Sequence, residues 1–290
     1  MTEPTSLHLY RVYAQPGTEG GKLIALHPGA ERLDDLEMQA MAATSGAPVS
    51  MFVTDLNDSG ISLRAFTPER EKGESDSGAL AALAWLFGQG RIADVSSVWM
   101  KGQEFPAQLC GGEWMLRQGD ATAEVLATTP SADALAYAVG LTPDQLDTAL
   151  PVLIASAGRP NLLLAVQDGE ALDAIHPDRE AIAALGHATG TTGLLAYTTR
   201  AARGLHADFR YFAPLKGFLE DNASSNTYAS LVAGLSLLGH VSAQDTLIRA
   251  SQGRATGRPS RLSAQADLNG ATARSVWVGG PAEPLRTPRP

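Results

Sequence analysis

Two aspartates have the residue type and setting that acid/base chemistry needs. Asp76 and Asp221 each lie in a polar loop just before an apolar stretch that favours a helix. Two carboxyl groups whose pKa values are separated by their surroundings can remove a proton and return one. We therefore predict Asp221 and Asp76 as the catalytic residues. The alternative for both is that an aspartate beside a helix start caps the helix or interacts with its dipole.

Small polar residues surround the two predicted helix starts. Backbone N–H groups at a helix N-terminus, together with the positive end of the helix dipole, favour an anion such as a substrate carboxylate. The substrate-binding candidates of this kind are Ser75, Ser77 and Gly78 in the first loop and Ser224, Ser225 and Asn226 in the second. The other interpretation is that these serines are ordinary helix caps.

Other ionisable residues give weaker signals. Glu71 is a further substrate-binding candidate, but it belongs to the mixed-charge run 69–72, which can equally face water. His27 precedes a proline and is predicted as a turn residue. The histidines form no metal-ligand spacing with a cysteine or carboxylate, so we predict no metal site. The glycine spacings match neither a dinucleotide-binding fingerprint nor a hydrolase nucleophile elbow.

The two candidate loops belong to segments that recur along the chain. Residues 64–68 read Arg-Ala-Phe-Thr-Pro, and residues 210–214 read Arg-Tyr-Phe-Ala-Pro. Each segment closes an alternating strand-forming run, which the proline ends. The helix candidates that follow, at 78–87 and 228–238, are apolar nearly all round, as is typical of a helix buried on every side. Further matches keep an offset of roughly 140 to 146 positions, which predicts an internal duplication.

The duplication predicts an α+β fold of two similar lobes. Each lobe is expected to be a mostly antiparallel sheet or open barrel wrapped round a central apolar helix. We predict an N-terminal lobe at 1–127 and a C-terminal lobe at 128–290, with the Pro- and Gly-rich tail at about 281–290 flexible. Helices are predicted at 132–139 and from Thr142 onward, where a capping residue precedes a proline.

Several motifs resemble those of the phenazine-biosynthesis (PhzF-like) protein family. Residues 252–262 read Gln-Gly-Arg-Ala-Thr-Gly-Arg-Pro-Ser-Arg-Leu, and residues 276–280 read Val-Trp-Val-Gly-Gly. Family members carry a Gln-Gly, a Gly-Arg-Pro-Ser and a Val-x-Val-Gly-Gly in this region. The Arg-Tyr-Phe-Ala-Pro of the second half and the Phe-Thr-Pro-x-x-Glu at 66–71 also agree. The resemblance covers nearly the whole chain and implies two diaminopimelate epimerase-like lobes that face each other across a cleft.

The resemblance implies isomerisation by proton transfer on a small metabolite, with no metal or organic cofactor. The family's acid/base glutamate falls at Val49, which cannot carry a proton, and the resemblance places Ser50 beside it among the substrate-binding candidates. The family's Gly-His segment is replaced by Asp76-Ser77-Gly78. Of the polar residues expected in the second loop, only Asp221 is unchanged. The related epimerases use a cysteine from each half, whereas Cys110 lies outside both loops.

Composition limits the classes of partner. The formal net charge of −9, with no basic run, argues against nucleic acid and anionic membranes. No stretch approaches the ~20 apolar residues of a membrane span, the N-terminal residues show no signal pattern, and the single Cys110 permits no intrachain disulfide. We therefore expect a soluble cytoplasmic protein. The resemblance adds a possible homodimer.

Three functional hypotheses follow. The leading one is a cofactor-independent isomerase or epimerase that moves a proton on a small carboxylate-bearing metabolite bound between the lobes. The alternative is a small-molecule-binding protein that kept the fold and lost the chemistry, because Val49 stands at the glutamate position. A third is a structural or interaction protein, whose interface would be an exposed apolar patch.

Overall fold

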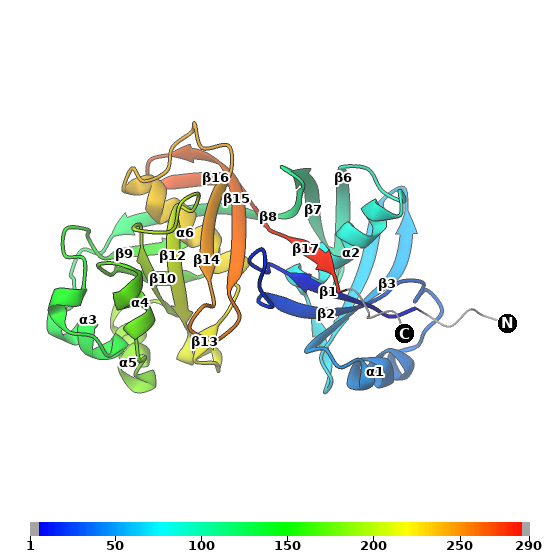
Figure 1. The fold of residues 1–290 in the computed structure, drawn as a ribbon, viewed down its shortest axis with the longest axis horizontal. Coiled ribbons are helices and arrows are strands. Elements are labelled where there is room, and N and C mark those ends of the chain that lie inside the picture. The colour runs from blue at the N-terminus through cyan, green and yellow to red at the C-terminus, as the bar shows by residue number, and fades with distance from the viewer. Residues whose placement is uncertain (1–5, 286–290) are drawn as a thin grey trace. The chain divides into compact units, whose positions relative to one another are not determined.

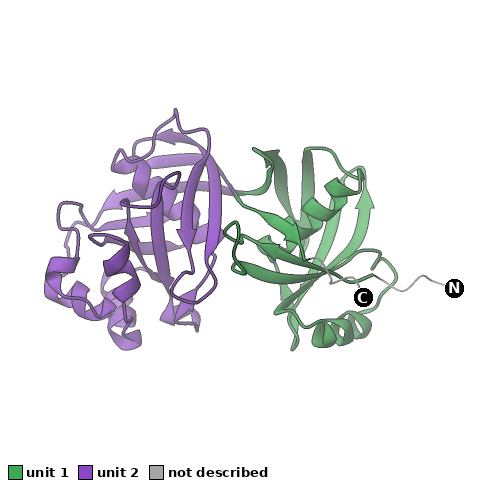
Figure 2. Ribbon diagram, viewed as in Figure 1, with its two compact units in different colours: residues 1–117, 279–290 green, residues 118–278 purple. Residues whose placement is uncertain are grey.

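The computed structural model describes residues 6–285, which form a mixed α and β fold (Figure 1). The chain divides into two compact units: unit 1 ends at Arg117 and resumes at Gly279, and unit 2 runs from Gln118 to Val278 (Figure 2). Unit 1 contains β1 (His8–Val12), β2 (Lys22–His27), α1 (Asp35–Thr44), β3 (Val49–Asn57), β4 (Gly60–Phe66), β5 (Glu71–Gly73), α2 (Asp76–Gly88), β6 (Val95–Met100), β7 (Gln103–Cys110) and β17 (Ala282–Pro284). Strand β8 (Glu113–Val125) runs from unit 1 into unit 2.

Unit 2 holds the remaining elements. They are α3 (Ala132–Val139), the 3₁₀ turn η1 (Pro143–Gln145), β9 (Leu153–Ser156), β10 (Pro160–Ala165), α4 (Gly169–Ala174), α5 (Arg179–Thr189), β11 (Leu194–Thr198), β12 (Ala207–Phe212), the 3₁₀ turn η2 (Pro214–Lys216), β13 (Glu220–Asp221), α6 (Ser225–Leu237), β14 (Ile248–Gln252) and β15 (Ser260–Asn269). Strand β16 (Thr272–Gly279) returns the chain to unit 1.

The division differs from the boundary predicted between residues 127 and 128. The chain passes between the units within β8, about ten residues earlier, and the C-terminal segment belongs to unit 1. Of the tail predicted as flexible, Ala282–Pro284 form β17 and pair with β1, and residues 286–290 lie outside the described part of the chain. This part of the tail is ordered because it pairs with β1. Proline can stand in a strand at a position where no hydrogen bond from its nitrogen is needed.

Of the two helices predicted after the linker, one is confirmed. Helix α3 spans Ala132–Val139, capped by Ser131 at its start and by Gly140 in the left-handed conformation at its end. The helix predicted from Thr142 was wrong beyond its first turn: η1 has only three residues. It stops because Leu146 is extended and forms a bridge with Val166 of the neighbouring segment.

Both units pair their strands in the same order. In unit 1, β1–β2 and β3–β4 are antiparallel, whereas β2–β3 and β4–β6 are parallel. In unit 2, β9–β10 and β11–β12 are antiparallel, whereas β10–β11 and β12–β14 are parallel. The antiparallel edge pairs β4–β5 and β12–β13 also correspond. This order is what an internal duplication predicts; the duplication itself stays a prediction.

Each unit contains one helix that is buried along most of its length. Helix α2 contacts β1, β2 and β3, and α6 contacts β9, β10 and β15 (Figure 1). Glycine leaves room on both helices for side chains of the neighbouring strands. A Cβ atom at Gly78 would lie 2.3 Å from Met51 Cε on β3, and one at Gly234 would lie 2.6 Å from Leu163 Cδ2 on β10. The apolar, small-residue sequences of these helices therefore match their position.

The other faces of the sheets carry separate cores. In unit 1, α1 packs on a cluster that includes Phe52 and Phe66. His27 stacks on Phe52, with 4.5 Å between ring centroids. The prediction of a turn residue was wrong for His27, which ends β2 and is 2% exposed. In unit 2, α3, α4 and α5 cover β10, β11 and β12 with a larger apolar cluster.

Candidate functional site

The first candidate loop is organised by helix capping. Ser75 is the N-cap of α2, and its hydroxyl accepts a hydrogen bond from the Gly78 N–H at 3.3 Å. The hydroxyls of Ser75 and Ser77 lie 3.4 Å apart, and both residues are buried. Asp76 is half-buried in the first turn, where the helix dipole favours a negative charge. The structure thus brings these four predicted residues together and gives Ser75 a capping role.

Strand alternation separates Ser50 from this loop. Successive side chains of a strand point to opposite faces, and Met51 points toward α2, where it meets Gly78. Val49 therefore lies on the α2 face, and Ser50 lies on the α1 face beside Phe66, its cross-strand partner. The Ser50 hydroxyl is buried and has no hydrogen-bond partner within residues 6–285. Ser50 thus lies on the opposite face of β3 from the start of α2, and its substrate-binding role stays a prediction.

Glu71 is held in an ion pair on the α1 side. Its two carboxylate oxygens accept hydrogen bonds from Arg64 at 2.9 and 3.0 Å, and Arg64 also donates to Asp35 at 2.7 Å. These hydrogen bonds, led by the one to Glu71, raise the pKa of the Arg64 guanidinium. The Arg64 guanidinium lies 5.2 Å from the centre of the Phe66 ring. Both carboxylate oxygens of Glu71 are thus hydrogen-bonded to Arg64, and this ion pair links β5 to β4.

Unit 2 repeats this arrangement in a more buried setting. Arg210 donates to both oxygens of Glu220 at 2.9 and 2.8 Å and lies 5.1 Å from the Phe212 ring centre. It also donates to the backbone carbonyls of Leu172 and Ile175. The side chains of this Arg–Glu pair are 7% and 14% exposed, against 30% and 39% in unit 1. Glu71 and Glu220 therefore hold equivalent positions in the two units, each paired with the arginine of the neighbouring strand.

The same alternation places Asp221 on the opposite face from Glu220. Phe209 stacks on Tyr228 of α6 at 5.7 Å, so Phe209 and Tyr211 face α6. Asp221 is the cross-strand partner of Tyr211 and shares that face. Its carboxylate accepts a hydrogen bond from the Ala223 N–H at 3.2 Å. Of the two acidic residues in this loop, only Asp221 therefore lies on the side of the buried helix.

Gln252, which was not among the predicted site residues, holds the start of α6 through hydrogen bonds. Buried Gln252 donates to the Asp221 carbonyl at 2.6 Å and accepts from the Ser224 N–H at 3.0 Å. The Ser224 hydroxyl donates to Thr227 at 2.8 Å. The Gln-Gly of the family motif was the sequence signal that could have identified Gln252. It becomes informative only once the loop before α6 is seen to pack against this glutamine.

The remaining candidates of this loop have structural partners. Ser225 is buried at the first position of α6. The side-chain amide of Asn226 donates to the Ala157 carbonyl. Cys110, at the end of β7, is half-buried and outside both loops, as its sequence position indicated. Among residues 6–285, no group of three or more His, Cys, Asp and Glu side chains is placed to hold a metal ion.

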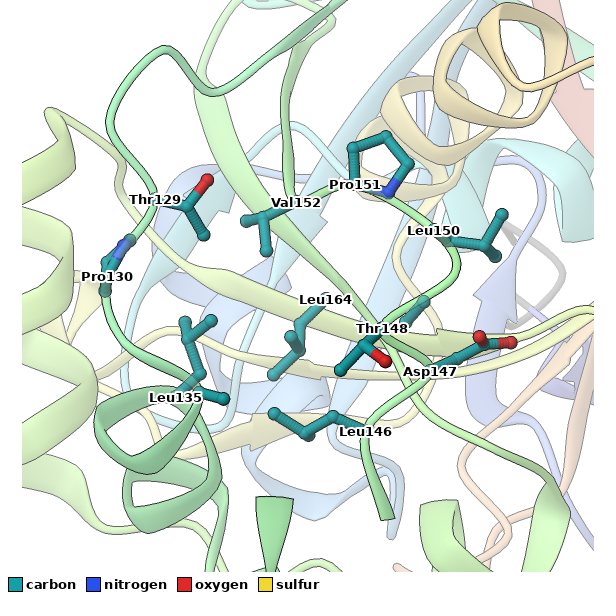
Figure 3. Close-up of a pocket in the computed structure, with 12 residues that line it drawn as sticks. Thr129, Pro130, Leu135, Leu146, Asp147, Thr148, Leu150, Pro151, Val152 and Leu164 are labelled. Carbon is teal, nitrogen blue, oxygen red and sulfur yellow. The ribbon is translucent and has the colours of Figure 1, made fainter. Parts of the chain in front are cut away.

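A pocket of about 230 Å³ in unit 2 lies among different residues (Figure 3). Leucines from three segments form much of its wall: Leu135 on α3, Leu146 and Leu150 in the following loop, and Leu164 on β10. Asp147 contributes the carboxylate seen at its edge in Figure 3. None of the predicted catalytic or substrate-binding residues lines this pocket.

Comparison with known proteins assigns the family. The sequence model described as "Phenazine biosynthesis-like protein" matches residues 14–287, nearly the full chain. The chain belongs to the phenazine biosynthesis-like family. The resemblance inferred from the sequence motifs is therefore confirmed.

Individual relatives agree with this assignment. An uncharacterized isomerase of Deinococcus radiodurans is 29% identical over 269 residues, which cover 87% of this chain and 83% of the relative. A PhzF-family protein from Bacillus anthracis has a TM-score of 0.79 at 18% identity, with 98% of both chains covered. A probable proline racemase from Agrobacterium radiobacter K84 has a TM-score of 0.55 at 11% identity, covering 98% of this chain and 93% of the racemase. The two solved structures show the fold that this chain shares with them.

The structure also bears on membrane insertion. Within the described residues, every helix is too short or too polar to cross a lipid bilayer.

Proposed function

We propose that the chain is an isomerase of the epimerase type that moves a proton on a small carboxylate-bearing metabolite without a cofactor. Membership of the phenazine biosynthesis-like family supports an isomerase-type role, as do the relatives named as an isomerase and a probable racemase. The observation that carries the proposal is the position of Asp221, which faces the start of α6 while its neighbour Glu220 is used by Arg210.

In this proposal Asp221 acts as the general base. Its carboxylate takes a proton from the carbon next to the substrate carboxylate, and the electron pair of the broken C–H bond delocalises into that carboxylate. Return of a proton to carbon restores a neutral centre, so protons and electrons balance without an oxidant or reductant. Asp76 is the second acid/base group of the proposal. The small polar residues around them then serve mainly to shape the two helix starts; these are Ser75, Ser77, Gly78, Ser224, Ser225 and Asn226.

Deuterium incorporation from heavy water tests this function. The protein is incubated with a panel of small amino and hydroxy acids, and mass spectrometry reads the mass increase of each acid. We expect protein-dependent exchange that Asp221→Asn abolishes and Asp76→Asn strongly reduces. Asp133→Asn is the matched control, because Asp133 is an exposed carboxylate in the first turn of α3. Exchange that both site variants retain in full would remove Asp221 and Asp76 from the mechanism.

One observation favours a second candidate function, a binding protein that has lost the chemistry. Val49 occupies the position of the family's acid/base glutamate and lies on the α2 face of β3. A valine there removes a proton carrier and leaves an apolar surface. This alternative predicts that an acid from the panel raises the melting temperature while no acid in the panel gains deuterium. The expected homodimer also stays a prediction.

A further inference from the structure

A half-buried lysine lies near Asp221 on the α6 side of unit 2. Lys216, in the turn η2, donates a hydrogen bond to the Tyr211 hydroxyl at 2.5 Å. Its ammonium group also lies 5.1 Å from the centre of the Tyr211 ring. Burial lowers the pKa of Lys216, the positive charge of Arg159 lowers it further, and Asp221 raises it. Asp221 is the cross-strand partner of Tyr211, so it lies on the same face of the sheet as the phenol that holds the ammonium.

A chain of hydrogen bonds fixes the phenol that holds this lysine. The Tyr211 hydroxyl donates to Asn161 Oδ1 at 3.0 Å. The Asn161 amide donates in turn to the Arg159 carbonyl at 3.1 Å and to the Ser230 hydroxyl at 3.4 Å. Since the single proton of the phenol is used by Asn161, its oxygen accepts from Lys216. The ammonium is therefore held in one position by β10, β12 and α6, and the bond to Tyr211 uses one of its three N–H groups.

The charge balance around this lysine favours an anion. The half-buried Lys216 and Asp221 carry opposite charges, and Arg159, whose side chain is exposed, adds a second positive charge. The adjacent carboxylate, Glu220, lies on the other face of the sheet with Arg210. One positive charge is thus left over, in a protein whose net charge is −9. A partly desolvated ammonium is stabilised when a carboxylate joins it through charge-assisted hydrogen bonds.

We propose that Lys216, held by Tyr211, binds the carboxylate group of the substrate and presents that substrate to Asp221. This inference rests on the proposed function, since it concerns the same site. A single excess charge suits a monoanionic carboxylate better than a dianionic phosphate. The serines and Asn226 that the sequence suggested for anion binding already have protein partners or are buried, whereas Lys216 offers an ammonium group that the Tyr211 hydroxyl holds on the α6 side.

The test measures how a carboxylate protects Lys216 from chemical modification. The chain has four lysines, Lys22, Lys72, Lys101 and Lys216, so brief reductive methylation can be followed at each site by mass spectrometry. Sodium acetate is the probe, and sodium chloride at equal ionic strength is the reference. We expect acetate at about twice its dissociation constant to slow labelling of Lys216 by about threefold. Labelling of the other three lysines should not change.

Two variants make the result specific. Tyr211→Phe removes the hydroxyl that positions the ammonium and should weaken the protection, although the ring is kept. Asp221→Asn should leave the protection intact, so this experiment can succeed even if the exchange chemistry fails. Equal labelling of Lys216 in acetate and chloride would overturn the inference. So would a Lys216 that stays unlabelled in both salts, because an anion would then not reach it either.

Discussion

Burial of His27 makes a quantitative prediction about acid stability. The side chain is 2% exposed and stacked on Phe52, and both ring nitrogens lack hydrogen-bond partners among the described residues. Desolvation, with a smaller contribution from nearby His8, lowers the pKa of His27 from 6.5 to about 4. The folded state therefore keeps this ring neutral at a pH at which the unfolded chain already binds a proton.

The sign and size of the effect follow from this difference. Between about pH 6.5 and pH 4 the unfolded state binds more protons, so the free energy of unfolding falls as the pH falls. Above pH 6.5 the group has no effect, and below pH 4 the loss is complete. At about 1.36 kcal/mol per pKa unit, the full shift corresponds to about 3.4 kcal/mol. Relaxation around the charged ring should reduce the measured loss to about 2–3 kcal/mol.

Urea unfolding at several pH values measures this loss. Three of the four tryptophans, Trp85, Trp99 and Trp114, lie in unit 1 with His27, so fluorescence mainly follows that unit. We compare the wild type with His27→Leu, which keeps an apolar side chain on Phe52 and leaves no buried ring nitrogen without a partner. At pH 7.5 the variant should be as stable as the wild type or more stable, by up to about 1 kcal/mol.

The decisive quantity is the difference between pH 7.5 and pH 4.5. The wild type should lose about 2–3 kcal/mol more than His27→Leu over this range, because the titrating carboxylates are common to both proteins. His187→Gln serves as control, since His187 is exposed on α5. Equal losses in the wild type and His27→Leu would refute the reasoning and show that the ring titrates normally in the folded protein.

Two further pairs of variants test the packing around the candidate loops. Glu220→Gln should destabilise the protein by about 3 kcal/mol, because it leaves a buried arginine without its carboxylate; Glu71→Gln, in the more exposed ion pair, should cost less than about 1 kcal/mol. Equal costs, measured by chemical denaturation, would contradict the role given to burial. Gly78→Ala should cost less than about 1 kcal/mol, because the new methyl group displaces only the terminal methyl of the flexible Met51 side chain. Gly88→Ala in the same helix meets no atom within 4 Å and should be neutral or stabilising, so a similar loss in both would reject the close approach of α2 to β3.

Much of the fold was accessible from local sequence patterns. The two apolar helices, the strands that end in proline and the equal spacing of the two halves depend on composition and periodicity, and the structure places elements at those positions. The boundary between the units was not accessible in this way. It falls inside β8, a continuous strand whose sequence carries no linker signal.

The candidate site was predicted only in part. The loops of Asp76 and Asp221 were found because polar residues interrupt apolar segments at matching positions. The sequence could not separate Glu220 from Asp221, which are adjacent acids of similar chemistry. Their roles diverge because consecutive strand residues face opposite sides, one toward Arg210 and the other toward α6.

The sequence by itself determined the family, the positions of many helices and strands, and the loops that carry ionisable groups. Each of these depends on residue types and on spacing along the chain. Only the tertiary structure decided which of those groups meet. Three contacts join residues from different elements: Lys216 with Tyr211, Gln252 with the start of α6, and His27 with Phe52. Such contacts arise from strand register and helix packing, which local patterns do not specify.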